Sequence, residues 1–364
     1  MLTGVDISNY RGFKSFRIEG LTRVNLLVGK NNSGKTALLE AVHLISSGGN
    51  PAVLADAAVR RGEVITAKDG RDTYADLTHF FYGHELKEEV WFALRTDDGV
   101  PKLTVRIVRA KEVPPQAELF DPEQELGSML VALFEGAPAT FGQPVPIAYN
   151  GGLLLDPRLR FRNAIPPNPS MPPRVGIFIP PESLGAGRLA DLWREVVLAG
   201  RQESVVKALR IIQPNLAEII FLPGSYARST NAAMGIVAVL NGFPRPVPLG
   251  SLGDGMRRLF ALANALTNAT NGFLFLDEID TGLHYSVTAD MWKLVLETAV
   301  HNDIQVFATT HSWDCVDGLH VLCKRDPSLM ANVAVHKIAG IIDHSVSFQG
   351  EDFVRAVEGG VELR

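Results

Sequence analysis

The chain has 364 residues, a length typical of about two domains or of one large α/β unit with insertions. Its formal net charge of −5 and its 46% hydrophobic content exclude a global electrostatic pull towards nucleic acid and exclude wholesale disorder. Two cysteines cannot build a disulfide framework, and no apolar run approaches the roughly 20 residues that span a bilayer. We therefore expect a cytoplasmic protein that does not enter a membrane.

A short apolar run that ends in a glycine-rich loop is the first informative segment. Residues 24–28 predict a buried strand, and a helical pattern follows from Lys35 to about Ser46. Between them, the spacing Gly29-x4-Gly34-Lys35-Thr36 matches the phosphate-binding P-loop. Glycines let backbone N–H groups converge on phosphate oxygens, and the helix N-terminus adds its positive dipole end.

The residues of this loop are the expected nucleotide contacts. We expect Lys35 to reach the β- and γ-phosphates and the Thr36 hydroxyl to ligate Mg²⁺. The full expected set is Gly29, Asn31, Asn32, Ser33, Gly34, Lys35, Thr36 and Ala37. A chance match in a glycine-rich turn is the alternative, and the strand before and helix after the loop argue against it.

The middle of the chain, residues 51–173, is less regular. Residues 91–108 alternate like two strands around a turn, and residues 147–155 do so around Asn150-Gly151, so each stretch predicts a hairpin. Five prolines between residues 166 and 173 indicate a loop or boundary.

Apolar strands alternate with helices in the rest of the chain. Residues 175–179, 273–276 and 306–310 predict buried strands, while residues 188–212 and 255–268 have helical spacing. Apolar strands separated by helices are typical of a largely parallel sheet that is covered on both faces.

Polar residues that suit catalysis follow two of these strands. Asp277 and Glu278 follow residues 273–276, and the carboxyl ends of parallel strands line the ligand crevice. We expect Asp277 to hold Mg²⁺ and Glu278 to polarise the attacking water. Residues 306–310 lead to His311, whose ring can donate a hydrogen bond to a γ-phosphate oxygen. Ordinary strand ends also carry such residues, and it is the pairing with the P-loop that favours a catalytic role.

Together these elements resemble the AAA-family, ABC-type ATPases of the RecF, structural-maintenance-of-chromosomes (SMC) and overcoming-lysogenisation-defect (OLD) group. The opening residues 9–16, Asn-Tyr-Arg-Gly-Phe-Lys-Ser-Phe, are similar to the first strand of that group, and a long insertion between Thr36 and Asp277 is usual there. The resemblance implies an α/β fold, a P-loop NTPase head of the ABC type with a mixed, mainly parallel sheet covered by helices. It also adds Arg11 to the expected nucleotide-binding residues.

The same resemblance predicts how the chain divides. Residues 1–50 and 174–364 would form the ATPase head, which includes a helical subregion at about residues 186–213, and residues 51–173 would form an inserted strand-and-helix (α+β) region. OLD nucleases carry a C-terminal TOPRIM domain, and the residues after His311 are too few to complete one. We expect an ATPase module without its own nuclease.

The group's signature motif, Leu-Ser-Gly-Gly followed by Gln, Glu or Lys, contacts the γ-phosphate bound by the opposite subunit. Residues 249–258 stand at the matching place, before a helix just upstream of the Asp277 strand. The match is imperfect, because either Gly253 or Ser251 takes the serine position, depending on the alignment. The amides of Gly253 and Gly255 could still form an anion-binding nest.

A second departure concerns the Q-loop. No glutamine occurs between Thr36 and Pro115, so the group's glutamine at the metal and lytic water is missing or replaced, with Asp76 and His79 as candidates. The run after Glu278 is similar to a run in OLD-like ATPases that would place Asp280 near a dimer interface.

These observations predict ATP hydrolysis by a homodimer that sandwiches ATP-Mg²⁺. Lys35, Glu278 and His311 would act in catalysis, while Thr36 and Asp277 would hold the metal. By resemblance, the output is a conformational signal to DNA or to a partner effector, such as a nuclease in phage defence or DNA repair. Two alternatives stay open: a nucleotide-stabilised binding or regulatory module with negligible turnover, and a P-loop enzyme of another class, such as a small-molecule kinase.

Overall fold

The computed structural model describes most of the chain outside the middle region. The described residues are 1–66, 73–87, 89–97, 102–109, 130–135, 145–147, 152–154, 176–222, 235–339 and 343–363. The predicted proline boundary at residues 166–173 and the turn at Asn150-Gly151 lie outside them.

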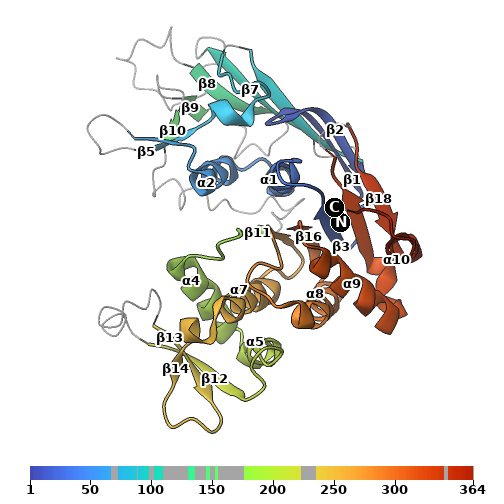
Figure 1. Ribbon diagram of the computed structural model, residues 1–364. Helices are drawn as coiled ribbons and strands as arrows, with labels where there is room; N and C mark the ends of the chain where they lie inside the picture. Colours follow the sequence, from blue (N-terminus) through green and yellow to red (C-terminus); the bar gives the residue numbers. More distant parts are fainter. Residues whose placement is uncertain are drawn as a thin grey trace.

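A six-stranded sheet lies at the centre of the molecule (Figure 1). Its spatial order is β11 (Gly176–Ile179), β15 (Phe273–Leu276), β16 (Gln305–Thr310), β3 (Val24–Val28), β17 (Val333–Lys337) and β18 (Val346–Gln349). All neighbours are parallel except β17 and β18. This confirms the predicted mixed, mainly parallel α/β sheet, and it brings the residues that follow β3, β15 and β16 to one edge.

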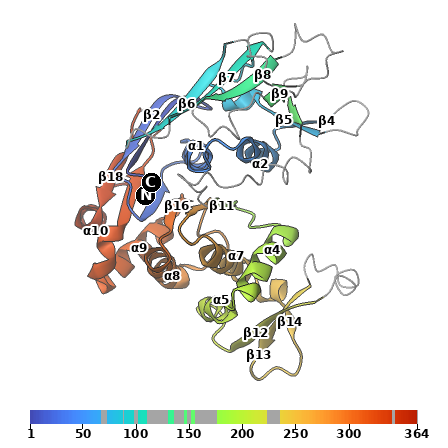
Figure 2. The same cartoon turned by 180° about the vertical axis from the view of Figure 1, so that it is seen from behind.

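Both faces of this sheet are buried, because its side chains alternate between two cores. In β15, Leu274 and Leu276 join a core with the helices on one face, whereas Phe273 and Phe275 join the core on the other. Figures 1 and 2 show which helices cover each face. The first face carries α7 (Asp254–Asn268), α8 (Thr288–His301) and α9 (Trp313–Arg325), and the second carries α1 (Lys35–Ser46).

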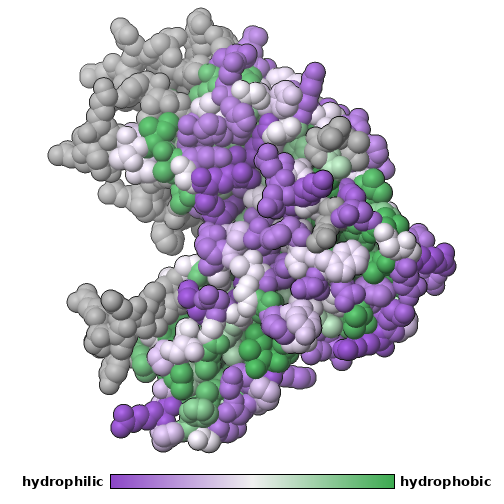
Figure 3. Space-filling model, viewed as in Figure 1, coloured by the Kyte–Doolittle hydropathy of each residue, from purple (hydrophilic) through white to green (hydrophobic). Residues whose placement is uncertain are grey.

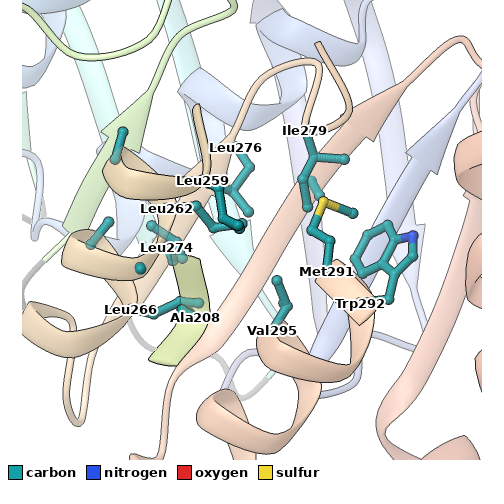
Figure 4. Packing of buried hydrophobic residues seen from close by; sticks show 14 of the residues in the cluster. Ala208, Leu259, Leu262, Leu266, Leu274, Leu276, Ile279, Met291, Trp292 and Val295 are labelled. Atoms are coloured by element: carbon teal, nitrogen blue, oxygen red, sulfur yellow. The ribbon is translucent and has the colours of Figure 1, made fainter. Parts of the chain in front are cut away.

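The packing on the first face is visible at close range. Leu259 and Leu262 of α7 lie against Leu274 and Leu276, and Trp292 of α8 fills the next space along the sheet (Figure 4). The burial of apolar residues at helical spacing therefore fixes α7 and α8 over β15, whose end carries the acidic pair.

A second sheet, which is antiparallel, packs over α1 and over α2 (Pro51–Arg61). Its order is β2 (Phe13–Glu19), β1 (Gly4–Tyr10), β6 (Trp91–Thr96), β7 (Lys102–Arg109), β8 (Leu130–Glu135) and β9 (Val145–Ile147). Trp91 pairs with Arg106, which confirms the first predicted hairpin. Strands from the first twenty residues and from the middle region thus form one sheet.

The second predicted hairpin is wrong. β9 pairs with β8, whereas β10 (Gly152–Leu154) joins β5 (Thr73–Asp76) and β4 (Val64–Thr66) in a separate sheet. Leu153 lies opposite Ala75, and both side chains are buried in the same core. The distant pairing buries apolar surface, which the local turn signal does not reveal.

A smaller lobe extends from the first face of the central sheet. It contains α4 (Ala186–Leu198), α5 (Gln202–Leu209), β12 (Leu216–Phe221), β13 (Ile236–Leu240) and β14 (Val247–Pro248). The predicted helix at residues 188–212 is divided into α4 and α5, because Gly200 adopts a left-handed φ of +67° between them. Trp193 stacks on Phe221 and contacts Phe260 of α7, which joins the lobe to the head.

Polar and apolar residues are unevenly spread over the surface. Figure 3 shows hydrophilic residues across the middle of one face, and hydrophobic residues over the part built by α5 and β12–β14. Across the described ranges, no helix is both long and apolar enough to cross a membrane. The last described segments after α9 are η6 (Pro327–Asn332), β17, β18 and α10 (Gly350–Glu358).

Candidate nucleotide-binding site

The P-loop between β3 and α1 needs glycine at both ends. Gly34 precedes α1 with φ +98°, and a Cβ there would lie 2.4 Å from the Phe13 ring. Gly29 has φ +149°, and its Cβ would lie 2.4 Å from the carbonyl oxygen of Ile338. Only glycine therefore fits these two positions, and the backbone is free to approach a ligand.

The polar groups of the P-loop are also suited to binding an anion. Lys35 folds across its own loop, and Nζ donates hydrogen bonds to the carbonyl oxygens of Gly29 at 2.7 Å and Lys30 at 2.9 Å. Burial lowers the pKa of Lys35, although the nearby carboxylates of Asp277 and Glu278 raise it. The Ser33 hydroxyl is buried and has no hydrogen-bond partner among the described residues. A buried unpaired donor beside a helix N-terminus suits phosphate oxygens.

Two hydroxyl groups and one carboxylate group lie in contact next to the P-loop. Thr36 Oγ1 donates to Asp277 Oδ2 at 2.9 Å, and Thr309 Oγ1 donates to Asp277 Oδ1 at 2.7 Å. The Glu278 N–H in turn donates to Thr309 Oγ1 at 2.8 Å. A hydroxyl and a carboxylate are hard oxygen ligands, so Thr36 and Asp277 fit Mg²⁺.

Glu278 and His311 lie together at the edge of the site. His311 Nδ1 is 3.5 Å from Glu278 Oε1, and their side chains are 50% and 37% exposed, respectively. Glu278 has φ +48°, a left-handed conformation that is unusual for its residue type and is often found where function requires it. The two side chains are thus adjacent and open to solvent.

A cavity of about 710 Å³ lies over Lys35, Thr36, Asp277 and Glu278, and His311 is not among the described residues that line it. The P-loop, the β1–β2 turn, Asp277, Glu278 and the residues around η1 (Thr78–Phe80) line it. Arg11 lies in this lining, but its guanidinium is already paired with Glu40 and Glu63, each at 2.8 Å.

Of the two residues considered as Q-loop replacements, His79 lines the cavity. Asp76 is not among the described lining residues, and no glutamine is among them.

The signature region lies apart from this cavity. η4 (Leu249–Leu252) contains Ser251, and Gly253, with φ +95°, precedes α7. Gly255 packs against the loop after Glu278, because a Cβ there would lie 2.6 Å from the Gly282 carbonyl oxygen. Ser251, Gly253 and Gly255 are not among the described residues that line the cavity.

Two residues that organise the site are not among the site residues predicted from the sequence. One is Thr309, whose hydroxyl joins Asp277 to Glu278. The other is Arg258, a buried residue of α7 that donates to the carbonyl oxygens of Pro180, Asp277 and Glu278. Burial lowers the pKa of Arg258 to about 10. In the sequence, the sign of this role is that Arg258 lies within the apolar stripe of the helix predicted at residues 255–268.

The fold and this site resemble those of P-loop ATPases with an ABC-type head. The head of an SMC protein bound to the C-winged helix domain of ScpA has the same fold: the TM-score is 0.50 at 12% identity, covering 98% of this chain and 99% of that one.

Sequence comparisons also indicate a likeness to ATPases. Residues 1–78 match the family "AAA ATPase domain", and residues 143–314 match "AAA domain, putative AbiEii toxin, Type IV TA system". An "ATP/GTP phosphatase" of Helicobacter pylori is 23% identical over 87% of each chain. The DNA replication and repair protein RecF of Marinomonas sp. is 53% identical over 47 residues, 13% of each chain. The matches confirm the resemblance to the RecF, SMC and OLD-like group and support an AAA-family ATPase.

Proposed function

We propose that the chain binds ATP with Mg²⁺ and hydrolyses it to ADP and phosphate. The observation that carries this proposal is the convergence of Lys35 and Thr36 with Asp277 and Glu278, through the Thr309 hydroxyl. A phosphate-binding cation, two metal ligands and a candidate general base are the parts that phosphoryl transfer to water requires.

Each residue would have a separate role. Lys35 would exchange its two loop carbonyls for phosphate oxygens, and Thr36 and Asp277 would hold Mg²⁺, which supplies charge stabilisation when bound. Glu278 would accept a proton from the attacking water, and His311 beside it would orient that carboxylate or contact the γ-phosphate. Arg11 would shape the cavity rather than neutralise phosphate, since two carboxylates already pair with it.

The working form would be a homodimer. Glu278 and His311 are open to solvent, and catalysis at such a carboxylate benefits from the exclusion of bulk water. In one copy, Ser251, Gly253 and Gly255 lie outside the nucleotide cavity. A second copy that presents this signature region would cover the γ-phosphate and complete the site.

The output would be a conformational change that a partner detects. The SMC head with the same fold is bound to a domain of ScpA, and the curated relative RecF is a DNA replication and repair protein. By analogy, opening and closing of the dimer would signal to DNA or to an effector protein such as a nuclease.

Phosphate release from ATP tests the proposed activity. We expect Glu278→Gln to lower kcat by roughly 100-fold or more while ATP still binds, because a general base contributes roughly that factor. Lys35→Ala should weaken ATP binding, and Glu203→Gln, an exposed carboxylate on α5, is the matched control. ATP binding without phosphate release in the unmodified protein would favour the nucleotide-stabilised module, and phosphate transfer to a metabolite would favour a kinase.

A further inference from the structure

Together, η1 and the loop that follows it form one wall of the nucleotide cavity, and their backbone is firmly held. Phe80 and Phe81 are buried in the core beneath it. The Arg11 N–H donates to the Phe80 carbonyl at 3.0 Å, and the Tyr82 N–H donates to the Asn9 carbonyl at 2.9 Å. Side chains on this loop are therefore presented to the cavity from a fixed backbone.

Two histidines on this wall face each other. His79 Nδ1 and His84 Nδ1 are 3.3 Å apart, and both residues line the cavity. The chain turns back to achieve this, because Gly83 and His84 both adopt left-handed conformations, with φ of +89° and +57°. A left-handed histidine is uncommon, and such backbone strain is often found where a side chain must be aimed.

The separation of the two nitrogens fits a shared metal ion. Two nitrogens that each lie about 2.0–2.1 Å from one tetrahedral ion are about 3.3–3.4 Å apart. On the other side of the His79 ring, Nε2 is 3.6 Å from Asp76 Oδ2, which is an ion-pair distance and too long for a hydrogen bond. The 3.3 Å contact between the two Nδ1 atoms is a hydrogen bond, which a shared metal ion would replace.

We propose that His79 and His84 form a two-histidine site for a divalent transition-metal ion at the wall of the nucleotide cavity. Among the residues with described positions, no group of three or more metal-binding side chains converges, so water or the nucleotide would complete the coordination. Imidazole ligands favour nickel, zinc or copper over magnesium, so the site is distinct from Thr36 and Asp277. The proposal does not depend on ATP hydrolysis, because the ion can be tested alone.

Calorimetric titration of the untagged, full-length chain with Ni²⁺ in excess Mg²⁺ and without nucleotide tests this site. We expect one saturable Ni²⁺ per chain. His79→Gln or His84→Gln should each weaken it by roughly 10-fold or more, because each removes one of the two protein ligands. The control His301→Gln alters an exposed histidine at the end of α8 and should leave binding unchanged.

The absence of saturable Ni²⁺ binding would overturn the proposal, as would equal affinity in the wild type and both single histidine variants. His84 is exposed and His79 is only partly buried, so their substitution should leave the thermal unfolding midpoint nearly unchanged, and a loss of binding in folded variants can be assigned to the ligands. Asp277→Asn should retain Ni²⁺ binding, and a loss there would instead place the ion at the magnesium ligands.

Discussion

At the scale of single residues, Thr309 connects Asp277, the proposed metal ligand, to Glu278, the proposed general base. Its hydroxyl donates to Asp277 and accepts from the Glu278 N–H. We expect Thr309→Val to lower kcat by roughly 10- to 100-fold, the worth of a hydrogen bond to a charged group, with little change in ATP affinity. Steady-state kinetics of Thr309→Ser, which keeps the hydroxyl, should restore most of the rate. If Thr309→Val and Thr309→Ser have equal rates, the hydroxyl has no such role.

Arg258 is the residue that joins α7 to the backbone of the acidic segment. Its guanidinium donates to three carbonyl oxygens, in one buried and two partly buried hydrogen bonds, and Arg258→Met removes all three bonds. The lost hydrogen bonds destabilise the fold, and removal of a buried charge offsets part of this cost. We therefore expect the free energy of unfolding to fall by about 2–4 kcal/mol.

Urea denaturation measures this loss, and the adjacent Arg257 offers a matched control. Arg257 is 47% exposed and contacts only Asp254, at 3.4 Å, among the described ion pairs. Arg257→Met should change the free energy of unfolding by less than about 0.5 kcal/mol. Equal effects of the two substitutions would contradict the assigned role of Arg258.

At the scale of secondary-structure elements, the junction of the P-loop with α1 depends on glycine. In Gly34→Ala, the new methyl group would meet the Phe13 ring, and alanine would adopt an unfavourable left-handed conformation that costs about 1–3 kcal/mol. We expect ATP affinity to fall roughly tenfold or more, because the loop must move away from its anion-binding shape. Fluorescent-nucleotide titration checks this.

Gly12→Ala in the neighbouring β1–β2 turn is the control for the P-loop prediction. A Cβ at Gly12 would have nothing within 4 Å, although the residue lines the same cavity. The substitution should therefore leave the fold and the P-loop undisturbed. A comparable loss of ATP affinity in Gly12→Ala and Gly34→Ala would contradict the steric explanation.

The elements that the sequence predicts best are those whose pattern is local. Alternation and helical spacing predict β3, β15, β16 and α7, and the rule for parallel strand ends places Asp277 near the P-loop. The pairing of β10 with β5 and the contact of Arg258 with Pro180 depend on how distant segments pack, which a single sequence does not encode locally. The roles of Ser251, Gly253 and Gly255 and the division at residue 50 stay predictions.

At the scale of the whole molecule, the fold places the candidate catalytic groups at one edge of the central sheet. The antiparallel sheet lies on one side of the central sheet, and the lobe of α4, α5 and β12–β14 lies on the other (Figures 1 and 2). Glu278 and His311 remain exposed in the single chain. A dimer that closes over ATP would explain both this exposure and the position of the signature region.

Mass measurement in solution with and without ATP-Mg²⁺, on wild type and Glu278→Gln, tests this account most directly. We predict that Glu278→Gln forms a stable dimer only with ATP-Mg²⁺, while the wild type releases phosphate and returns to its nucleotide-free state. Removal of the metal with a chelator should prevent the dimer. A protein that stays monomeric with ATP-Mg²⁺ in both forms would contradict the sandwich mechanism.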